Sequence, residues 1–251
     1  MRAKIRERAN QLFVRCPRIG QIGYDLLRIS GIDRSTQGTK PFLKQLAQRG
    51  FAPKTIVDVG ANHGGWSRIA TAVFPQANFV LIEPQAEMSP FLDNLCAGNP
   101  KMQWILAGAG ATEGELALTI WDDYQGSAFL TDEVHQMVPF TQRRQVPIIT
   151  LNSLIAAQQM DMPDFVKIDV QGFEMEVLRG ATRCLGQTEL FILEAFLYHP
   201  QNARPNFYKI VSFMESYGYA VYDFTDMAHH PQSGALTQIN ICFMLANSLF
   251  K

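Results

Sequence analysis

The 251-residue sequence predicts an α/β fold in which helices cover both faces of a mostly parallel β-sheet. The first observation is that short, apolar, β-branched runs, such as residues 55–57, suit strands that are buried on both faces of a parallel sheet. The second is the segment KTIVDVGANHGGWS at residues 54–67, in which such a run passes through a glycine-rich turn into a helical pattern. A strand that feeds a glycine-rich turn and then a helix is the first unit of a nucleotide-binding α/β fold.

The glycine-rich turn carries four candidate cofactor-binding residues, Asp58, Gly60, Asn62 and Gly64. The dinucleotide fingerprint G-x-G-x-x-G places its second glycine where the pyrophosphate approaches, and Asn62 stands at that position in this sequence. The Asp58 carboxylate would repel a pyrophosphate, but it can orient the turn or accept from an ammonium group. The pattern therefore favours a cationic cofactor such as S-adenosylmethionine, and the alternative is a tight turn without a ligand.

Two later positions are candidates for binding the rest of the cofactor. Glu83 closes the second predicted strand, residues 78–82, and an acidic residue there is placed to bind both ribose hydroxyls, the alternative being a surface glutamate. The small residues from Ala107 to Gly110 follow the third predicted strand, and they either leave room for an adenine ring or form a simple turn. We count Glu83 and Ala107 as candidate cofactor-binding residues.

The candidate catalytic residues lie on the fourth and fifth predicted core strands. Lys167 and Asp169 are two apart on the strand at residues 164–170, so their side chains point to the same side. Asp169 ends its strand where open α/β sheets bind ligands, and it is a candidate for both catalysis and cofactor binding, whereas Lys167 can simply neutralise a carboxylate. Glu194, near the end of the next strand, and His199, just beyond it, are the other candidates for a general base.

A divalent ion such as Mg²⁺, shared by Asp169 and Glu194, is an alternative way to lower the pKa of an acceptor hydroxyl. The spacing of these two carboxylates and the histidine is not that of a metal-ligand motif, so we assign no metal-binding residue. S-adenosylmethionine is the expected cofactor, with a metal as an open alternative.

The N-terminal segment predicts a separate unit ahead of the main domain. Residues 1–30 carry seven Arg or Lys against one Glu and one Asp, among apolar residues with helical spacing. We expect a helical cap or arm over residues 1–38 that packs on the main domain, or else binds a membrane surface or joins copies of the chain in a homo-oligomer. Residues 39–251 are expected to form the domain that binds S-adenosylmethionine, with Thr39 as the N-cap of its first helix.

Charge and composition exclude several classes of partner. The formal net charge is −1, so no overall field selects nucleic acid. No apolar run of about 18 residues predicts a transmembrane helix, and no apolar segment suits a signal peptide. The four cysteines are far apart and form no C-x-x-C pair, which is typical of free thiols in a reducing compartment. We therefore expect a cytoplasmic protein.

The segment at residues 122–145 is polar and lacks a regular pattern. Loops of that length inside a compact domain are usually functional, and we expect this one on the substrate side of the site.

The chain resembles the FkbM-like methyltransferases, a class I S-adenosylmethionine-dependent family, over approximately residues 39–247. The motifs that carry the resemblance are VDVGANHGGWS at 57–67, the pair Glu83-Pro84, TLNSL at 150–154 and KIDVQGFEMEVLRGA at 167–181. The family usually has Glu where Gln171 stands and Asp where Asn152 stands. The resemblance implies a seven-stranded sheet, methyl transfer to oxygen, and sugar or polyketide hydroxyls as acceptors.

The sequence therefore predicts an S-adenosylmethionine-dependent O-methyltransferase that acts on a hydroxyl of a sugar, polysaccharide or natural product. An NAD-dependent oxidoreductase of Rossmann type is one alternative, and Asn62 argues against it. A non-catalytic binding protein with a degenerate site is the other, and the intact glycines, Glu83 and Asp169 argue against that.

Overall fold

The computed structural model describes residues 38–120, 127–129, 142–197 and 206–248. Contacts within the chain separate residues 1–36 from residues 37–251, and the fold described below is that of the second unit. The predicted helical cap over residues 1–38 lies outside the described residues apart from Gly38, and so does the candidate base His199.

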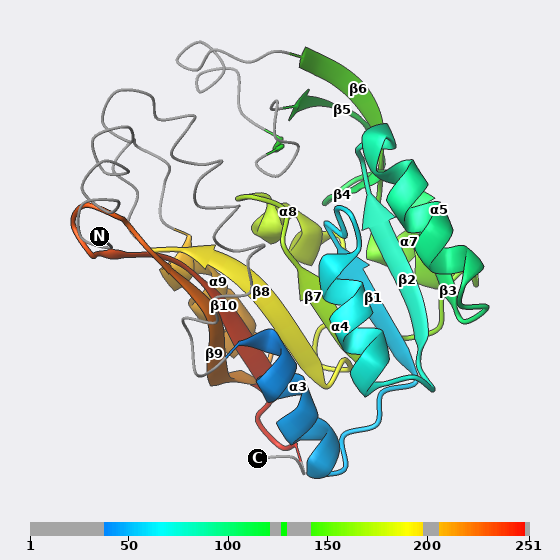
Figure 1. The fold of residues 1–251 in the computed structure, drawn as a ribbon. Helices are drawn as coiled ribbons and strands as arrows, with labels where there is room; N and C mark the ends of the chain where they lie inside the picture. The colour runs from blue at the N-terminus through cyan, green and yellow to red at the C-terminus, as the bar shows by residue number, and fades with distance from the viewer. Residues whose placement is uncertain (1–37, 121–126, 130–141, 198–205, 249–251) are drawn as a thin grey trace, which may run out of the picture. The chain divides into compact units, whose positions relative to one another are not determined.

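Seven strands form the main sheet, in the spatial order β3 (Met102–Leu106), β2 (Asn78–Glu83), β1 (Thr55–Val59), β7 (Phe165–Ile168), β8 (Leu190–Phe196), β10 (Leu236–Leu245) and β9 (Tyr219–His229). The strands from β3 to β8 are parallel, and β10 pairs antiparallel with both β8 and β9. Every residue of β1 is buried, as expected of a central strand with helices on both faces. The predicted class I methyltransferase fold is confirmed (Figure 1).

Helices cover both faces of the main sheet (Figure 1). One face carries α3 (Thr39–Gln48), α4 (Gly65–Val73), the 3₁₀ turn η1 (Ala86–Met88) and α5 (Ser89–Ala97), and the other carries α7 (Leu151–Ala156), α8 (Glu174–Arg179) and α9 (Phe207–Ser216). Alternation along β1 explains both layers, because Ile56 packs in the hydrophobic cluster of the first face and Val57 in that of the second. No helix in the described ranges is long and apolar enough to span a membrane.

A second sheet of three strands, in the order β4 (Gly108–Ala109), β6 (Gln142–Ile149) and β5 (Gly114–Ile120), follows the first half of the main sheet along the chain. The antiparallel strand predicted near residues 115–121 is confirmed, because β5 pairs antiparallel with β6. The irregular segment predicted over 122–145 is wrong for residues 142–145, which this pairing draws into β6. Residues 121–126 and 130–141 lie outside the described residues, so the substrate-side loop stays a prediction.

The start of α3 differs from the prediction, because Gly38 and not Thr39 is the N-cap. Thr39 is the first helical residue, and its hydroxyl donates to the carboxylate of Asp226 on β9, which also accepts from the Thr39 backbone N–H. Asp226 has a left-handed backbone, with φ +52°, at an irregularity in the β9–β10 pairing. A residue from a distant strand therefore satisfies the free donors of this helix end.

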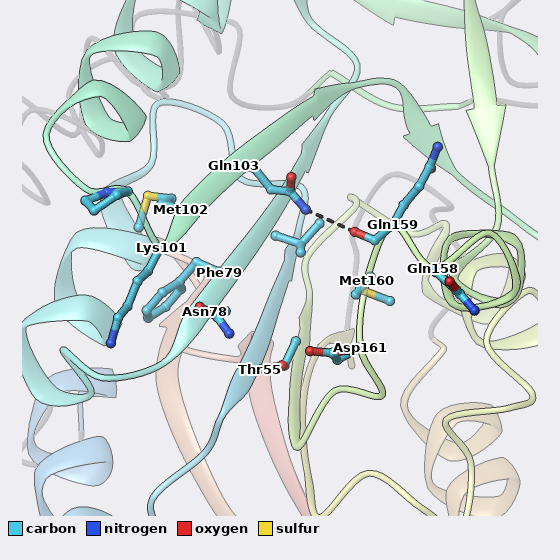
Figure 2. Close-up of a pocket in the computed structure, with 12 residues that line it drawn as sticks. Thr55, Asn78, Phe79, Lys101, Met102, Gln103, Gln158, Gln159, Met160 and Asp161 are labelled. Carbon is cyan, nitrogen blue, oxygen red and sulfur yellow. Dashed lines mark hydrogen bonds between the residues drawn. The ribbon is translucent and has the colours of Figure 1, made fainter.

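The two ends of the parallel strands differ in what they hold. A cavity of about 260 Å³ opens at the amino ends of β1, β2 and β3, next to the segment that follows α7 (Figure 2). The Gln103 side chain on β3 donates a 3.1 Å hydrogen bond to the Gln159 carbonyl there, as the dashed line in Figure 2 shows. Ligands of open α/β sheets bind at the opposite, carboxyl ends of the strands, where all the candidate site residues that the structure describes lie.

Candidate functional site

The turn after β1 is in backbone contact with the end of β7. Gly60 has φ +77°, and a Cβ added there would lie 1.9 Å from the carbonyl oxygen of Asp169. The Gly60 N–H donates to the Ile82 carbonyl on β2 at 2.9 Å. Glycine is therefore required at position 60 by backbone geometry and by the close approach of β7, and this contact joins the turn to the strand end that carries Asp169.

Asn62 and Gly64 complete the turn into α4, and both have left-handed backbones, with φ +49° and +77°. The backbone N–H of Asn62 donates to Glu83 Oε2 at 2.7 Å. Gly64 is the N-cap of α4, and a Cβ added there would lie 2.6 Å from Leu95 Cδ2 on α5. Gly64 thus allows α4 and α5 to pack closely, while Asn62 ties the turn to the end of β2.

Glu83, at the end of β2, accepts three hydrogen bonds from the residues around the turn. Its side chain accepts from the Asn62 N–H, from the Gln85 N–H at 3.0 Å and from the Gln85 side chain at 3.1 Å. Burial raises the pKa of Glu83 above its ordinary value, and the hydrogen bonds from Asn62 and Gln85 oppose that rise. A carboxylate offers about four acceptor positions, so the three hydrogen bonds from described residues leave one that a ligand hydroxyl could use.

Lys167 joins two carboxylates across adjacent strands. Its Nζ lies 3.1 Å from Asp58 Oδ1 and 3.3 Å from Asp169 Oδ2, and it donates to the Gly60 carbonyl at 3.2 Å. Burial by itself lowers the pKa of the Lys167 ammonium, but the charges of Asp169 and Asp58 outweigh burial and hold it above its ordinary value. The Lys167 Nζ also lies 6.0 Å from the centroid of the Trp66 ring.

Asp58 and Asp169 share Lys167 but differ in access. Asp58 is fully buried, and its Oδ2 accepts from the Ser67 hydroxyl on α4 at 2.6 Å. The Asp169 side chain is 27% exposed, just beyond the end of β7 rather than within the predicted strand. The ammonium group beside Asp58 in the structure is that of Lys167, whereas the sequence pattern favoured a cofactor ammonium there. Asp169 is the accessible carboxylate of the pair.

Gln171 links Asp169 to Glu194 on β8. Its Nε2 donates to Asp169 Oδ1 at 3.1 Å and to Glu194 Oε2 at 2.9 Å. Glu194 is buried, and its Oε1 accepts from the Gln238 side chain on β10. Burial, followed by the nearby charges of Asp169 and Glu174, raises the pKa of Glu194 well above its ordinary value.

Glu174, the first residue of α8, fixes the turn between Asp169 and that helix. Its Oε1 accepts from the N–H groups of Gly172 and Val170, and its Oε2 accepts from the Asn206 side chain at 2.9 Å. Burial is the largest cause that raises the pKa of Glu174 to about 7, against the opposing backbone hydrogen bonds. Asn206 in turn accepts from the Phe196 N–H at the end of β8, so the turn after β7 is tied to that strand.

Of the small residues after β3, Gly108 and Ala109 form β4 of the second sheet, where they pair with β6. Ala107 is buried, and its N–H donates to the Glu83 carbonyl at 3.1 Å. A Cβ added at Gly108 would lie 2.6 Å from the Phe129 ring and 2.7 Å from Ile148, so glycine makes room there for protein side chains. Ala107 stays a predicted adenine contact, next to the backbone of the residue predicted to bind the ribose.

The structure brings Asp58, Gly60, Asn62, Glu83, Asp169 and Glu194 to one edge of the sheet. Sequence reasoning missed Gln85 and Gln238, the buried or half-buried amides that hold Glu83 and Glu194. Gln85 also accepts from the Ser127 hydroxyl at 2.8 Å, which links Glu83 to the residues after β5. The only signal for Gln85 was its place two residues after a strand-end acid, whereas Gln238 pairs with the site only through the β8–β10 register. In the part of the chain that the structure describes, no group of three or more His, Cys, Asp or Glu could hold a metal ion.

Comparison with known proteins gives a family match and two curated relatives. The profile described as "Methyltransferase FkbM domain" matches residues 58–221. Methyltransferase 1 of Beauveria bassiana is 28% identical over 185 residues, which cover 66% of this chain and 72% of that protein. Hexuronic acid methyltransferase AglP of Haloferax volcanii is 22% identical over 165 residues, 64% of each chain.

A similar solved structure is the precorrin-6y C5,15-methyltransferase of Geobacter metallireducens, with a TM-score of 0.44 and 14% identity over 80% of this chain and 84% of that one. That TM-score assigns neither fold nor function, and the fold assignment rests on the strand order and on the family match.

Proposed function

Because the chain belongs to the FkbM methyltransferase-domain family and is an S-adenosylmethionine-dependent methyltransferase, we propose that it methylates a hydroxyl oxygen of a sugar, polysaccharide or natural product. The observation that carries this proposal is the accessible Asp169 carboxylate at the joint carboxyl ends of β7 and β1, beside the glycine-rich turn. A hydroxyl acceptor must lose its proton as the methyl group arrives, and a positioned carboxylate can take that proton. The name of the Haloferax volcanii relative, a hexuronic acid methyltransferase, supports a sugar acceptor.

The cofactor half of the proposal uses the turn after β1 and the end of β2. S-adenosylmethionine supplies a methyl group that its sulfonium has already activated. Gly60, Asn62 and Gly64 shape the turn against which the cofactor lies, and Glu83 has one acceptor position left for a ribose hydroxyl. Asp58 acts indirectly, because its oxygens are engaged by Ser67 and Lys167 and hold α4 and β7 in register with the turn.

The acceptor half uses Asp169 as the general base. Lys167, 3.3 Å from Asp169 Oδ2, stabilises the ionised form of that carboxylate, which is the form able to accept a proton. When bound, S-adenosylmethionine would supply the methyl group and leave as the neutral thioether, while Asp169 would take the proton that the acceptor hydroxyl gives up. Glu194 and His199 remain alternative bases, and a Mg²⁺ ion shared by Asp169 and Glu194 remains an alternative activator. Glu194 is 3% exposed, which favours Asp169 as the group that meets the acceptor.

The test is a transfer assay with S-adenosylmethionine labelled at its methyl group and a panel of sugars, uronic acids, polysaccharides and polyketide alcohols. We expect label in one hydroxyl-bearing class, and binding of the demethylated cofactor at micromolar level, about −8 kcal/mol by calorimetry. NADH serves as the control ligand and should not bind. Transfer to a nitrogen or carbon acceptor only, with hydroxyl compounds inert, would contradict the proposed acceptor class.

A further inference from the structure

One amide nitrogen lies between the two carboxyl groups of the acceptor half. Gln171 Nε2 is 3.1 Å from Asp169 Oδ1 and 2.9 Å from Glu194 Oε2. A side-chain amide has two N–H groups, so these two hydrogen bonds use its full donor capacity. The remaining oxygens of the carboxyl groups are also engaged, Asp169 Oδ2 by Lys167 and Glu194 Oε1 by Gln238.

Gln171 has a left-handed backbone conformation, which residues other than glycine seldom adopt. Gln171 has φ +55° and is followed by Gly172 at φ +100°. A left-handed backbone is unfavourable for a residue with a Cβ, and such residues persist where the surroundings fix them. The surroundings here are the Glu174 carboxylate, which accepts from the N–H groups on both sides of Gln171. The turn is therefore built to aim the Gln171 side chain at Asp169 and Glu194.

The position of Gln171 Nε2 is that of a bridging ligand. A divalent ion shared by two carboxylates would contact one oxygen of each. In this site one oxygen of each carboxyl group, Asp169 Oδ1 and Glu194 Oε2, accepts from the same amide nitrogen. Mg²⁺ and Mn²⁺ favour oxygen ligands, whereas an amide that uses its N–H groups toward the carboxylates presents donors to any cation between them. The amide and a shared cation thus compete for one position.

We propose that Gln171 is a positioning residue whose amide takes the place of a bridging cation between Asp169 and Glu194, so that Asp169 acts without a divalent metal. This inference rests on the proposed role of Asp169 in methyl transfer. The amide orients Asp169 Oδ1, and by donating to both carboxyl groups it favours their ionised forms. Among the described residues, the charged or titratable groups that act on this pair are Lys167, Glu174 and, through Lys167, Asp58.

Two substitutions separate the amide's role from its shape. Gln171→Glu places a third carboxyl group beside Asp169 and Glu194, which removes both donors and completes an oxygen-rich cation site. Gln171→Met keeps the length and the apolar stem but removes the donors without adding charge. Gln103→Glu and Gln103→Met are the matched controls, because Gln103 also donates a hydrogen bond but lies on β3 at the far end of the strands (Figure 2).

The first measurement is Mn²⁺ binding to the full chain by calorimetry, which needs neither cofactor nor acceptor. We expect no binding below about millimolar by the wild type, Gln171→Met or the Gln103 variants, and at least a tenfold gain in affinity for Gln171→Glu. The inference would be overturned if the wild type bound Mn²⁺ stoichiometrically and Gln171→Glu bound it no more tightly. Mn²⁺ binding is measured without methyl transfer. The inference about Gln171 can therefore fail while the proposed function stands, and the proposed function can fail while the inference about metal binding stands.

The second measurement is the pH dependence of kcat, with carboxyl NMR titration of Asp169 and Glu194 in the same variants. Loss of the donors disfavours the ionised carboxylates, so their titration midpoints and the acidic limb of kcat should move upward by about one pH unit in Gln171→Met, and further in Gln171→Glu. The Gln103 variants should match the wild type. Two results would show that the amide has no such role. One is wild-type activity that is lost in EDTA and restored by Mg²⁺, and the other is that the titration midpoints are unchanged in both Gln171 variants.

Discussion

The cofactor half of the site, around Glu83, and the acceptor half, around Asp169 and Glu194, differ in the hydrogen-bond donors that hold their carboxyl groups. Around Glu83, two of the three donors are backbone N–H groups, those of Asn62 and Gln85. Around Asp169 and Glu194, the donors given by the structure are the side chains of Lys167, Gln171 and Gln238. Backbone donors survive most substitutions, whereas side-chain donors can be removed one by one. The comparison indicates that the cofactor half is fixed by the fold and that the acceptor half is set by individual side chains.

The largest expected effect tests the side-chain half at Lys167. Lys167→Met leaves the carboxylate of Asp58 buried without its cation, which typically costs about 3–5 kcal/mol of unfolding free energy. Denaturant unfolding followed by fluorescence measures this loss. Lys101→Met is the matched control, because Lys101 is exposed and its ammonium group donates to Gln76. This variant should change stability by about 0.5 kcal/mol or less.

A double variant sharpens the same prediction. Asp58→Asn removes the charge but can still accept from Ser67, so combining it with Lys167→Met should recover part of the lost stability. If the two effects simply add, the ion pair between β1 and β7 does not hold the halves together as described.

The next prediction tests the cofactor half of the site at Glu83. Glu83→Gln keeps the shape but replaces one acceptor oxygen by an NH2 group, which then faces the N–H of either Asn62 or Gln85. We expect cofactor affinity to fall by more than about tenfold, because charged hydrogen bonds to ribose are lost. Calorimetry with the demethylated cofactor measures it, with the exposed Glu115→Gln on β5 as control. Equal affinities for the two variants would remove Glu83 from the cofactor site.

A smaller effect is expected at Gln85, which donates to Glu83 both from its backbone N–H and from its side chain. Gln85→Leu removes the 3.1 Å hydrogen bond to Glu83 and the acceptor for Ser127, but keeps the backbone N–H. Cofactor affinity should fall by only about threefold to tenfold, as for one neutral partner of a charged group. A loss as large as that of Glu83→Gln would mean that side chains, not the backbone, fix this half.

The last effect concerns stability and not cofactor binding, and it is a pH slope set by Glu174. Its folded-state pKa is raised to about 7, so the stability from the neutral form is complete below the ordinary glutamate pKa and is lost as pH rises toward 7. The wild type should therefore lose stability relative to Glu174→Gln between about pH 4.5 and 7, by at most about 1.4 kcal/mol per pH unit. Urea midpoints across that range give the slope, and a parallel pair of curves would contradict the assignment.

Much of this site could be predicted because parallel strands end at one edge of the sheet. The strand, turn and helix at residues 54–67 indicated the cofactor turn, and the acids that close β2, β7 and β8 had to meet near it once the strands were parallel. The register of β1 with β7, which pairs Asp58 with Lys167, could not be derived, because an apolar strand buried on both faces fits several registers.

The rest depended on contacts between residues far apart in the chain and on backbone dihedrals. Asp226 serves the start of α3 across 187 residues, and Asn206 reaches Glu174 across 32. The bridging role of Gln171 requires the left-handed φ that the Glu174 carboxylate supports, and a Gln in sequence gives no sign of it. The length of β6 was missed for the same kind of reason, since polar residues 142–145 become a strand only by pairing with β5.

The central claim is that Asp169 takes the proton of a hydroxyl acceptor. The most direct measurement is single-turnover transfer of labelled methyl from saturating S-adenosylmethionine, comparing the wild type with Asp169→Asn and with the exposed control Asp161→Asn. We predict a rate lower by roughly 10² or more for Asp169→Asn, with cofactor affinity little changed and with Asp161→Asn like the wild type. A folded Asp169→Asn variant that transfers the methyl group at the wild-type rate would contradict the account.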